Sequence, residues 1–358
     1  MTFAVRSMTR WLAALAIVAA GSPTFAQVEA QAGVEANPRV QLPAVPAPEV
    51  EATRAPLPED VAQLRAQDAR VLVLGYRLLT GNARYCEDAT SSAGLLLHDM
   101  AAYGAGDRLR RVLGLTGDVG VQALVPGGPA ERAGVVVDDT VLAIGAMRIA
   151  DIATEGAEPW ERIETIRAEA ERLLAQTGRL PITVMRSEGP ATIEIDGVPA
   201  CRSRFEIGEG GRAVADGHRI VIGPDFAGID YPDPLLAAVL SHELAHNLLR
   251  HRAWFDANGG RKRKAVRLTE READRLMPWL LANAGFDPRA AMRFFEEWGP
   301  RHGGWIFRAR THDGWDERVE FIEAELPLIE SLQQSERELD WAQHFSREEL
   351  PGSKRATR

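Results

Sequence analysis

The chain is poor in lysine and cysteine and carries an excess of acidic residues. Of its 42 basic residues, only Lys262, Lys264 and Lys354 are lysines, and 51 acidic residues give a formal net charge of −9. This balance argues against a general nucleic-acid-binding protein, which normally has a basic surface. The two cysteines, Cys86 and Cys201, exclude a disulfide-dense scaffold and a four-cysteine zinc site within this chain.

Apolar runs long enough to span a bilayer are also absent. The most apolar stretch, residues 11–20, is about half of the ~20 residues that a spanning helix needs. It follows Arg6 and Arg10 and precedes small residues that end at Ala26, which is the arrangement of an export signal. We expect a signal peptide over residues 1–26, with an uncleaved anchor as the alternative. The mature protein is then exported into a bacterial periplasm, either soluble or peripherally membrane-associated.

The length of 358 residues predicts about two domains. Residues 27–58 contain six prolines and no hydrophobic period, which is typical of a flexible, partly polyproline linker. Residues 59–79 carry apolar side chains mostly at helical spacing, interrupted by Asp68. This pattern predicts a helix that ends near Gly81.

Residues 117–187 combine short strands and tight turns with an amphipathic helix over 161–175. The segments that resemble the core of a PDZ domain are Pro126-Gly127-Gly128-Pro129-Ala130, Ala133-Gly134 and Ile144-Gly145. The resemblance implies a β-rich domain over 105–197 that binds an extended peptide at a sheet edge. We place its peptide-carboxylate loop near residues 114–117. A β-rich spacer without a ligand is the alternative.

The segment from Asp233 to His246 predicts a buried helix, in which Asp233 caps the start and Pro234 suits the first turn. His242 and His246 lie one helical turn apart, so their imidazoles share a face and can bind one Zn²⁺. Glu243 lies about 100° further round the helix. There it can take a proton from metal-bound water.

A catalytic zinc site needs a third protein ligand. His251 does not fit the metzincin spacing. Thr269 and Glu272 resemble a capping box and predict a helix start, on which Glu270 and Asp274 share one face. We therefore predict that Glu270 binds the metal and that Asp274 orients a ligating histidine. An acidic helix start without a metal is the alternative.

Three motifs together resemble those of an M48-type zinc metallopeptidase, a gluzincin. They are His242-Glu243-Leu244-Ala245-His246, Glu270-Arg271-Glu272-Ala273-Asp274, and His312 with Arg318. The third motif departs from the family, because Asp313 replaces a proline. The resemblance implies an α+β fold: a mainly helical zincin protease domain with a small sheet, over 59–104 and 198–340, interrupted by the PDZ-like domain and followed by a tail over 341–358.

The same resemblance, together with the export signal, implies an exported zinc endopeptidase that hydrolyses polypeptides, such as unfolded or envelope proteins in quality control. One Zn²⁺ per chain is bound by the two histidines and Glu270, and Glu243 is the general base. His312 and Arg318 stabilise the oxyanion, or His312 occupies the fourth zinc position in the resting state. The alternatives are an inactive metal- or peptide-binding adaptor and a chaperone-like envelope protein.

Three further features bear on the architecture. Export favours a disulfide between Cys86 and Cys201, which flank the PDZ-like insertion, with two free thiols as the alternative. The Asp-Gly pair at 216–217 predicts a hairpin over 213–222, whose edge offers a site for a substrate strand. The basic run at 261–264 favours either a solvated loop or contact with anionic lipid headgroups.

Overall fold

The computed structural model describes residues 56–103, 106–302 and 313–350. The predictions for the signal peptide, for almost all of the linker and for His312 fall outside these residues. The described part is a mixture of helices and small sheets, which confirms an α+β fold class. Within it, no helix combines the length and apolar character that crossing a membrane requires.

An antiparallel sheet organises the region predicted to be PDZ-like. Its main strands have the order β2-β3-β4-β6-β7, and β5 pairs with β4; β2 belongs to the segment 59–104, which precedes the predicted PDZ-like domain. The strands are β2 (Leu95–Asp99), β3 (Val119–Leu124), β4 (Thr140–Ile144), β5 (Met147–Arg148), β6 (Arg179–Arg186) and β7 (Gly189–Asp196). Side chains alternate along β6, so Leu180, Ile182 and Val184 point into one core.

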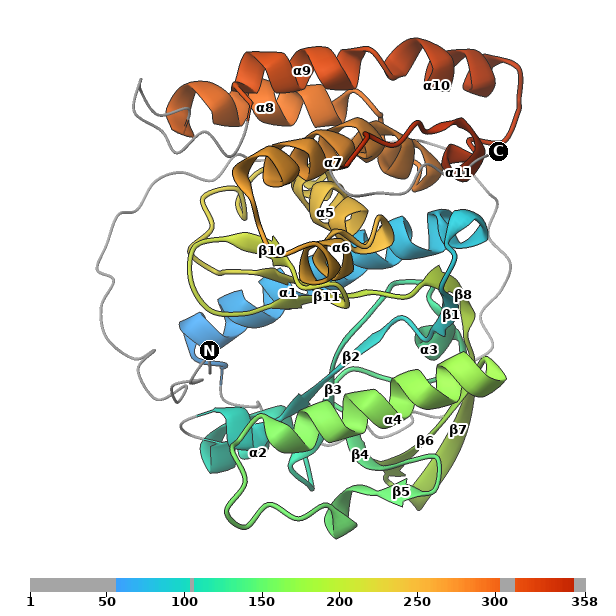
Figure 1. The fold of residues 1–358 in the computed structure, drawn as a ribbon. Helices are drawn as coiled ribbons and strands as arrows, with labels where there is room; N and C mark the ends of the chain where they lie inside the picture. The colour runs from blue at the N-terminus through green and yellow to red at the C-terminus, as the bar shows by residue number, and fades with distance from the viewer. Residues whose placement is uncertain (1–55, 104–105, 303–312, 351–358) are drawn as a thin grey trace, which may run out of the picture. The chain divides into compact units, whose positions relative to one another are not determined.

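The helix α4 (Glu161–Thr177), predicted as an amphipathic helix over 161–175, covers one face of this sheet (Figure 1). Ile163 and Ile166 supply its buried contacts, and Gly178 ends the helix in the left-handed conformation with φ 70°. The helix α2 (Gly106–Leu113) and the short α3 (Pro129–Arg132) complete the region. The predicted strands and helix are confirmed here, whereas the PDZ assignment itself stays a prediction.

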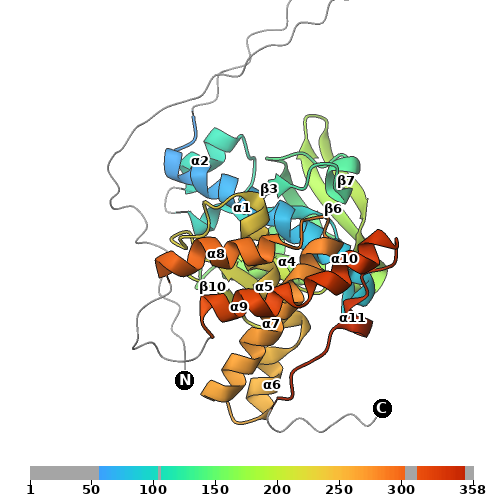
Figure 2. The same ribbon diagram turned by 90° about the horizontal axis from the view of Figure 1, so that it is seen from above.

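A second core is built mainly by helices. The long helix α1 (Glu59–Gly81) packs against α5 and α7, α5 also packs against α8, and α7 against α9 (Figures 1 and 2). These helices are α5 (Asp233–Leu248), α6 (His251–Ala257), α7 (Arg263–Asn283), α8 (Ala290–His302), α9 (Trp315–Glu323), α10 (Leu326–Gln334) and α11 (Trp341–His344). Leu236, Leu240 and Leu244 bury one side of α5 completely, which leaves its histidine face directed at α7.

A small sheet of order β10-β11-β9 lies beside α5. Its strands are β9 (Arg204–Ile207), β10 (Ala213–Ala215) and β11 (Arg219–Ile222). β10 and β11 form the predicted hairpin, and Gly217 adopts φ 99° in its turn, a conformation that suits glycine. β9 runs parallel to β11 and completes the sheet.

Two local predictions on the helices are wrong. Asp233 is the first residue of α5 rather than its cap, and its carboxylate accepts a hydrogen bond from Arg70 Nε at 2.6 Å. The helix α7 begins at Arg263, not at Thr269, whose hydroxyl donates to the carbonyl of Val266 at 2.8 Å. The capping-box pattern misleads because Thr269 and Glu272 are both buried in the interior of the helix.

The chain enters and leaves the six-stranded sheet through paired strands. β1 (Ala89–Ser92) is antiparallel to β8 (Val198–Cys201), with Ala89 opposite Cys201. The disulfide between Cys86 and Cys201 closes this junction, with Cα atoms 5.5 Å apart. The predicted pairing of these cysteines is thereby confirmed.

Removing this disulfide is expected to lower stability strongly. The bridge spans 115 residues of sequence, and closing a loop of that size stabilises the folded chain by ~4–5 kcal/mol in the chain-entropy model. We expect a Cys86→Ala, Cys201→Ala variant to lose about that much free energy of unfolding in urea titrations. A loss below ~1 kcal/mol would show that the β1–β8 ladder already holds the junction unaided.

Asp68, which interrupts the apolar face of α1, faces the larger sheet. Gln122 Nε2 on β3 donates to Asp68 Oδ2 at 2.6 Å, and Arg65 Nη2 pairs with Asp138 Oδ1 at 2.7 Å. Burial raises the pKa of Asp68 to about 6, although the Gln122 hydrogen bond opposes this shift. A polar contact therefore joins α1 to the sheet where the helical pattern is broken.

The raised pKa of Asp68 predicts a pH-dependent stability. The folded carboxyl stays protonated up to about pH 6, whereas the unfolded one ionises near pH ~3.9. This contribution to folding is thus full below pH ~4 and is lost as the pH rises through the folded pKa. We expect Asp68→Asn to raise the free energy of unfolding by ~2 kcal/mol at about pH 8 and hardly at all at about pH 4. Asp60→Asn, at an exposed position of α1, is the control; the same effect of Asp68→Asn at both pH values would refute the assignment.

Candidate metal site

The packing of α5 against α7 brings three candidate ligands together. His242 and His246 lie on α5, and Glu270 lies in the interior of α7 and is 8% exposed. The distance between the two Nε2 atoms is 3.2 Å. Glu270 Oε2 lies 3.3 Å from His242 Nε2, and its Oε1 lies 3.6 Å from His246 Nε2. All three predicted ligands therefore converge on one point, and they form a group that could hold a metal ion.

The spacing of these atoms suits zinc. Bonds of about 2.0–2.1 Å in a tetrahedral arrangement place ligand atoms ~3.3–3.4 Å apart, close to the three distances observed. Two imidazole nitrogens and one carboxylate oxygen are also a donor set that zinc accepts in catalytic sites. The residues present therefore fit a zinc ion.

Asp274 and Arg318 support His242. Asp274 Oδ1 lies 3.0 Å from His242 Nδ1, on the opposite side of the ring from Nε2, which lies 3.3 Å from Glu270 Oε2. Arg318 on α9 donates to both Asp274 oxygens, from Nε at 2.7 Å and from Nη2 at 2.6 Å. The structure thus places Asp274 where an orienting residue must stand. It places Arg318 behind Asp274, a contact that the sequence interpretation did not include.

His251 supports His246 in the same way. The Nδ1 atoms of the two rings are 2.7 Å apart, and His251 Nε2 lies 2.9 Å from Glu272 Oε2. Because the carboxylate accepts from His251 Nε2–H, His251 Nδ1 is the acceptor for His246 Nδ1–H. The Nε2 atom of His246 is then unprotonated and faces the other two ligands.

The Nε2 atoms of His242 and His246 face each other beside the Glu270 carboxylate, so a positive charge between them is favourable. Burial disfavours the charged form of His242, yet the Asp274 and Glu270 carboxylates outweigh it and raise the pKa of His242 to about 10. Burial lowers the pKa of His246 well below its usual value. Both rings bind a metal only as neutral imidazoles, so His242 would release a proton when the ion binds, whereas His246 is already neutral.

Glu243 is placed to act as a base beside this group. Burial raises its pKa from 4.5 to about 7; Glu270 adds to this shift, and His242 opposes it. Its side chain is half-buried rather than sealed from solvent, so water can reach it. A carboxyl group that titrates near neutrality is suited to proton transfer at ordinary pH.

The edge strand β10 borders Glu243. Backbone hydrogen bonds at Arg212 and Asp216 point toward β11, and their direction alternates along an antiparallel strand. The amides and carbonyls of Ala213 and Ala215 therefore point away from the sheet, and the Ala215 amide bonds to the Glu243 carboxyl. A strand edge that has no neighbouring strand among the described residues thus runs directly beside the candidate base.

Asp313 anchors the chain just before α9. It lies 3.0 Å from Arg271 Nη2 and 3.3 Å from Arg267 Nε, both on α7. The residue that replaces the proline of the family motif thus ties this segment to the metal-site helix. His312 itself lies outside the described residues, so its two predicted roles stay predictions.

Sequence reasoning missed the support behind His246. His251 was weighed only as a ligand, and Glu272 was assigned to a capping box. Arg347, in the predicted C-terminal tail, pairs with Glu272 Oε1 at 2.6 Å. The residue that could have revealed this support is Glu272, because a carboxylate two residues from Glu270 on a buried helix needs a cationic partner.

The predicted peptide loop at residues 114–117 is wrongly placed. It leads into β3, which is paired on both sides by β2 and β4 and has no free edge for an added strand. An added peptide needs an edge strand such as β2, beside which α4 lies. Arg167 Nη2 on α4 donates to the outward carbonyl of Leu97 on β2 at 3.5 Å.

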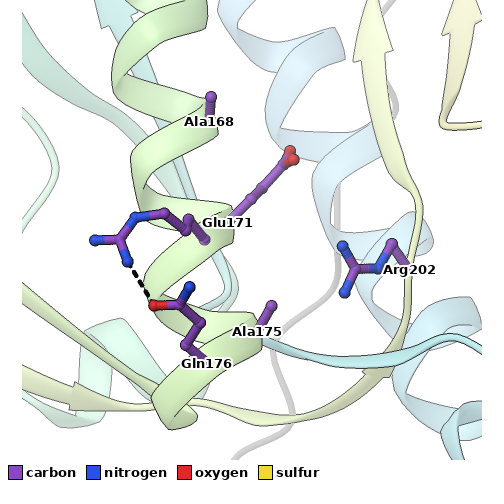
Figure 3. Close-up of a pocket in the computed structure, with 6 residues that line it drawn as sticks. Ala168, Glu171, Ala175, Gln176 and Arg202 are labelled. Atoms are coloured by element: carbon purple, nitrogen blue, oxygen red, sulfur yellow. Dashed lines mark hydrogen bonds between the residues drawn. The ribbon is translucent and has the colours of Figure 1, made fainter.

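Two other surface features lie apart from the metal group. A depression of about 350 Å³ is lined by Arg202 and by α4 residues that include Glu171, Ala175 and Gln176, and it shares no residue with the metal group (Figure 3). The basic run at 261–264 is exposed around the start of α7. Arg261 lies over the ring of Phe255, 5.0 Å from its centroid.

Comparisons with known proteins reveal only a weak structural similarity. No protein-family model matches the chain, and no curated protein matches it. Among solved structures, it is similar to a chain described as "HtrA-type protease AlgW with decapeptide", with 19% identity over 31% of this chain and a TM-score of 0.22. The chain spans 30% of that protein's length. A likeness this weak carries no argument about function.

Proposed function

We propose that the chain is a zinc-dependent endopeptidase, as its M48-type motifs imply. One observation carries the proposal: His242, His246 and Glu270 converge with zinc-like spacing beside a carboxyl group, Glu243, whose pKa is raised to about 7. A metal site with a purely structural role needs no such base. The base therefore favours catalysis over the alternative of an inactive metal-binding adaptor.

The residues divide the chemistry among them. Bound zinc would supply Lewis acidity, which polarises a peptide carbonyl and acidifies water. Glu243 accepts the proton of the attacking water and passes it to the leaving amine. Asp274, held by Arg318, keeps His242 oriented. The proposal keeps both roles for His312: it stabilises the oxyanion together with Arg318, or it occupies the fourth zinc position in the resting state.

The proposed substrate is an extended polypeptide, such as an unfolded or envelope protein. The outward amide and carbonyl of Ala213 and the outward carbonyl of Ala215 offer backbone hydrogen bonds, and the Ala215 amide is held by Glu243, so a peptide that adds to β10 passes close to the base. Val214 between them is 46% exposed, so this part of β10 is accessible from solvent. Because backbone groups are common to all residues, such recognition implies that many substrate sequences are accepted.

A second proposed function is peptide binding by the PDZ-like region. The observation that favours it is the position of β2 at the edge of its sheet, next to α4. We also propose that residues 1–26 direct export to a periplasm. We further propose that the exposed basic run at 261–264 contacts anionic lipid headgroups and so associates the protein peripherally with a membrane.

The peptidase proposal is tested with unfolded casein. Purified full-length protein should cleave casein into fragments that mass spectrometry can map, and a zinc chelator should abolish their formation. Cleavage that survives complete chelation would place the activity elsewhere in the chain. Absence of cleavage by zinc-loaded protein would favour the adaptor.

A further inference from the structure

The C-terminal segment 346–350 lies across α7 and holds a buried carboxylate there. Arg347 Nε and Nη2 lie 2.6 and 3.0 Å from the two oxygens of Glu272, and the Glu348 amide donates to Glu272 Oε1 at 2.8 Å. Glu272 is fully buried. Leu350 is also buried, and Arg275 donates to the carbonyl of Ser346 at 3.2 Å, so the segment is fixed at several points.

From Glu272 a continuous line of contacts leads to a candidate ligand. Glu272 Oε2 accepts from His251 at 2.9 Å, and the His251 ring meets His246 at 2.7 Å. These contacts fix the tautomers and ring planes of His251 and His246, because each imidazole uses one nitrogen for the preceding contact and the other nitrogen for the next. The orientation of His246 is thereby set, three contacts away, by Arg347.

The two histidines are thus supported by separate parts of the chain. His242 is backed by Asp274 and by Arg318 of α9, whereas His246 is backed by His251, Glu272 and Arg347. Each of these two series of contacts ends at an arginine that pairs with a buried carboxylate. The second series depends on a residue that lies 75 positions away in sequence from Glu272.

We propose that Arg347 is a positioning residue for the metal, and that the C-terminal segment thereby sets the zinc affinity of the site. The inference rests on the proposed zinc site. Without the guanidinium, Glu272 loses two of the contacts that hold its plane, and His251 loses a fixed acceptor. His246 then samples ring orientations that turn Nε2 away from the other ligands, which weakens binding while the ligands themselves are intact.

The test is zinc affinity of the full chain, measured by competition with a chromophoric chelator. Arg347→Ala should weaken zinc binding ~10–100-fold, in the range known for partners of metal ligands. Arg347→Lys, which retains one charged donor, should fall between this variant and the wild type. Arg275→Ala is the control, because Arg275 holds the same segment through Ser346 and Glu348 without touching Glu272, and its additional pairing with Glu325 makes its loss at least as disruptive to the fold.

A zinc dissociation constant of Arg347→Ala within ~3-fold of the wild type would overturn the inference and leave the zinc site standing. Equal weakening by Arg275→Ala would also overturn it, since the effect would then come from loosening of the segment. Thermal unfolding of the zinc-free proteins separates affinity from general damage: Arg347→Ala should melt no lower than Arg275→Ala, which also loses the pairing with the buried Glu325. Wild-type protein that binds no zinc through His242 and His246 would overturn the proposed function, and the inference with it.

Discussion

Glu243→Gln is expected to lower the rate of casein hydrolysis ~10³–10⁴-fold while the protein keeps its zinc. Glutamine has nearly the same shape as glutamate, but it cannot accept the proton of the attacking water. The Glu243 carboxyl is the group whose pKa, about 7, lies at working pH beside the three ligands. Because Glu243 is not itself a ligand in this arrangement, zinc content should not change.

Two measurements make this result decisive. Zinc content by elemental analysis and thermal unfolding should match those of the wild type. Glu323→Gln, an equivalent change at an exposed position of α9, should leave hydrolysis unaffected. Full activity in Glu243→Gln would remove the base from the account, and loss of zinc would make Glu243 a ligand instead.

The second large effect concerns the metal itself. The His242→Ala, His246→Ala variant should bind less than ~0.1 zinc per chain, because a lone carboxylate holds zinc weakly. Hydrolysis should disappear with the metal. Zinc added to the wild type should raise its melting temperature, since an ion that binds only the folded state stabilises it, and this rise should vanish in the variant.

The control for this variant is His218→Ala. His218 is exposed in the β10–β11 turn, so its removal tests whether zinc binds surface histidines without specificity. It should retain full stoichiometry and the full thermal shift. Full zinc content in the double variant would contradict the ligand assignment outright.

The sequence predicts the local features of the site well. The i, i+4 spacing of His242 and His246 needs only a helix, and the helix forms because Leu236, Leu240 and Leu244 bury its other side. The Asp-Gly turn of the β10–β11 hairpin is likewise a local signal. Such features depend on neighbours within one or two turns, which a single sequence displays.

The features that the sequence does not predict depend on distant contacts. His251 meets Glu272 across 21 positions, and Arg347 meets it across 75, so no local pattern marks either pair. Thr269 and Glu272 match a capping box, yet α7 starts at Arg263 because Ala265 and Val266 pack against Phe255 and extend the helix. Tertiary packing overrides the local capping preference there.

The misplaced peptide loop has the same origin. The residues at 114–117 have the composition of a ligand-binding turn, but whether the following strand can pair with a peptide depends on its place in the sheet. β3 is central because β2, which precedes it in sequence, takes one side, and β4 takes the other. Strand order is a global property of the fold, and the local pattern does not reveal it.

The most direct measurement of the central claim is a titration of zinc-free wild-type protein with zinc, with bound metal and casein hydrolysis followed in the same samples. Activity should be absent at the start, rise in proportion to occupancy and level off at one zinc per chain, because one group of three ligands forms the site. Hydrolysis by zinc-free protein, or full zinc occupancy without any hydrolysis, would contradict the claim that this chain is a zinc-dependent peptidase.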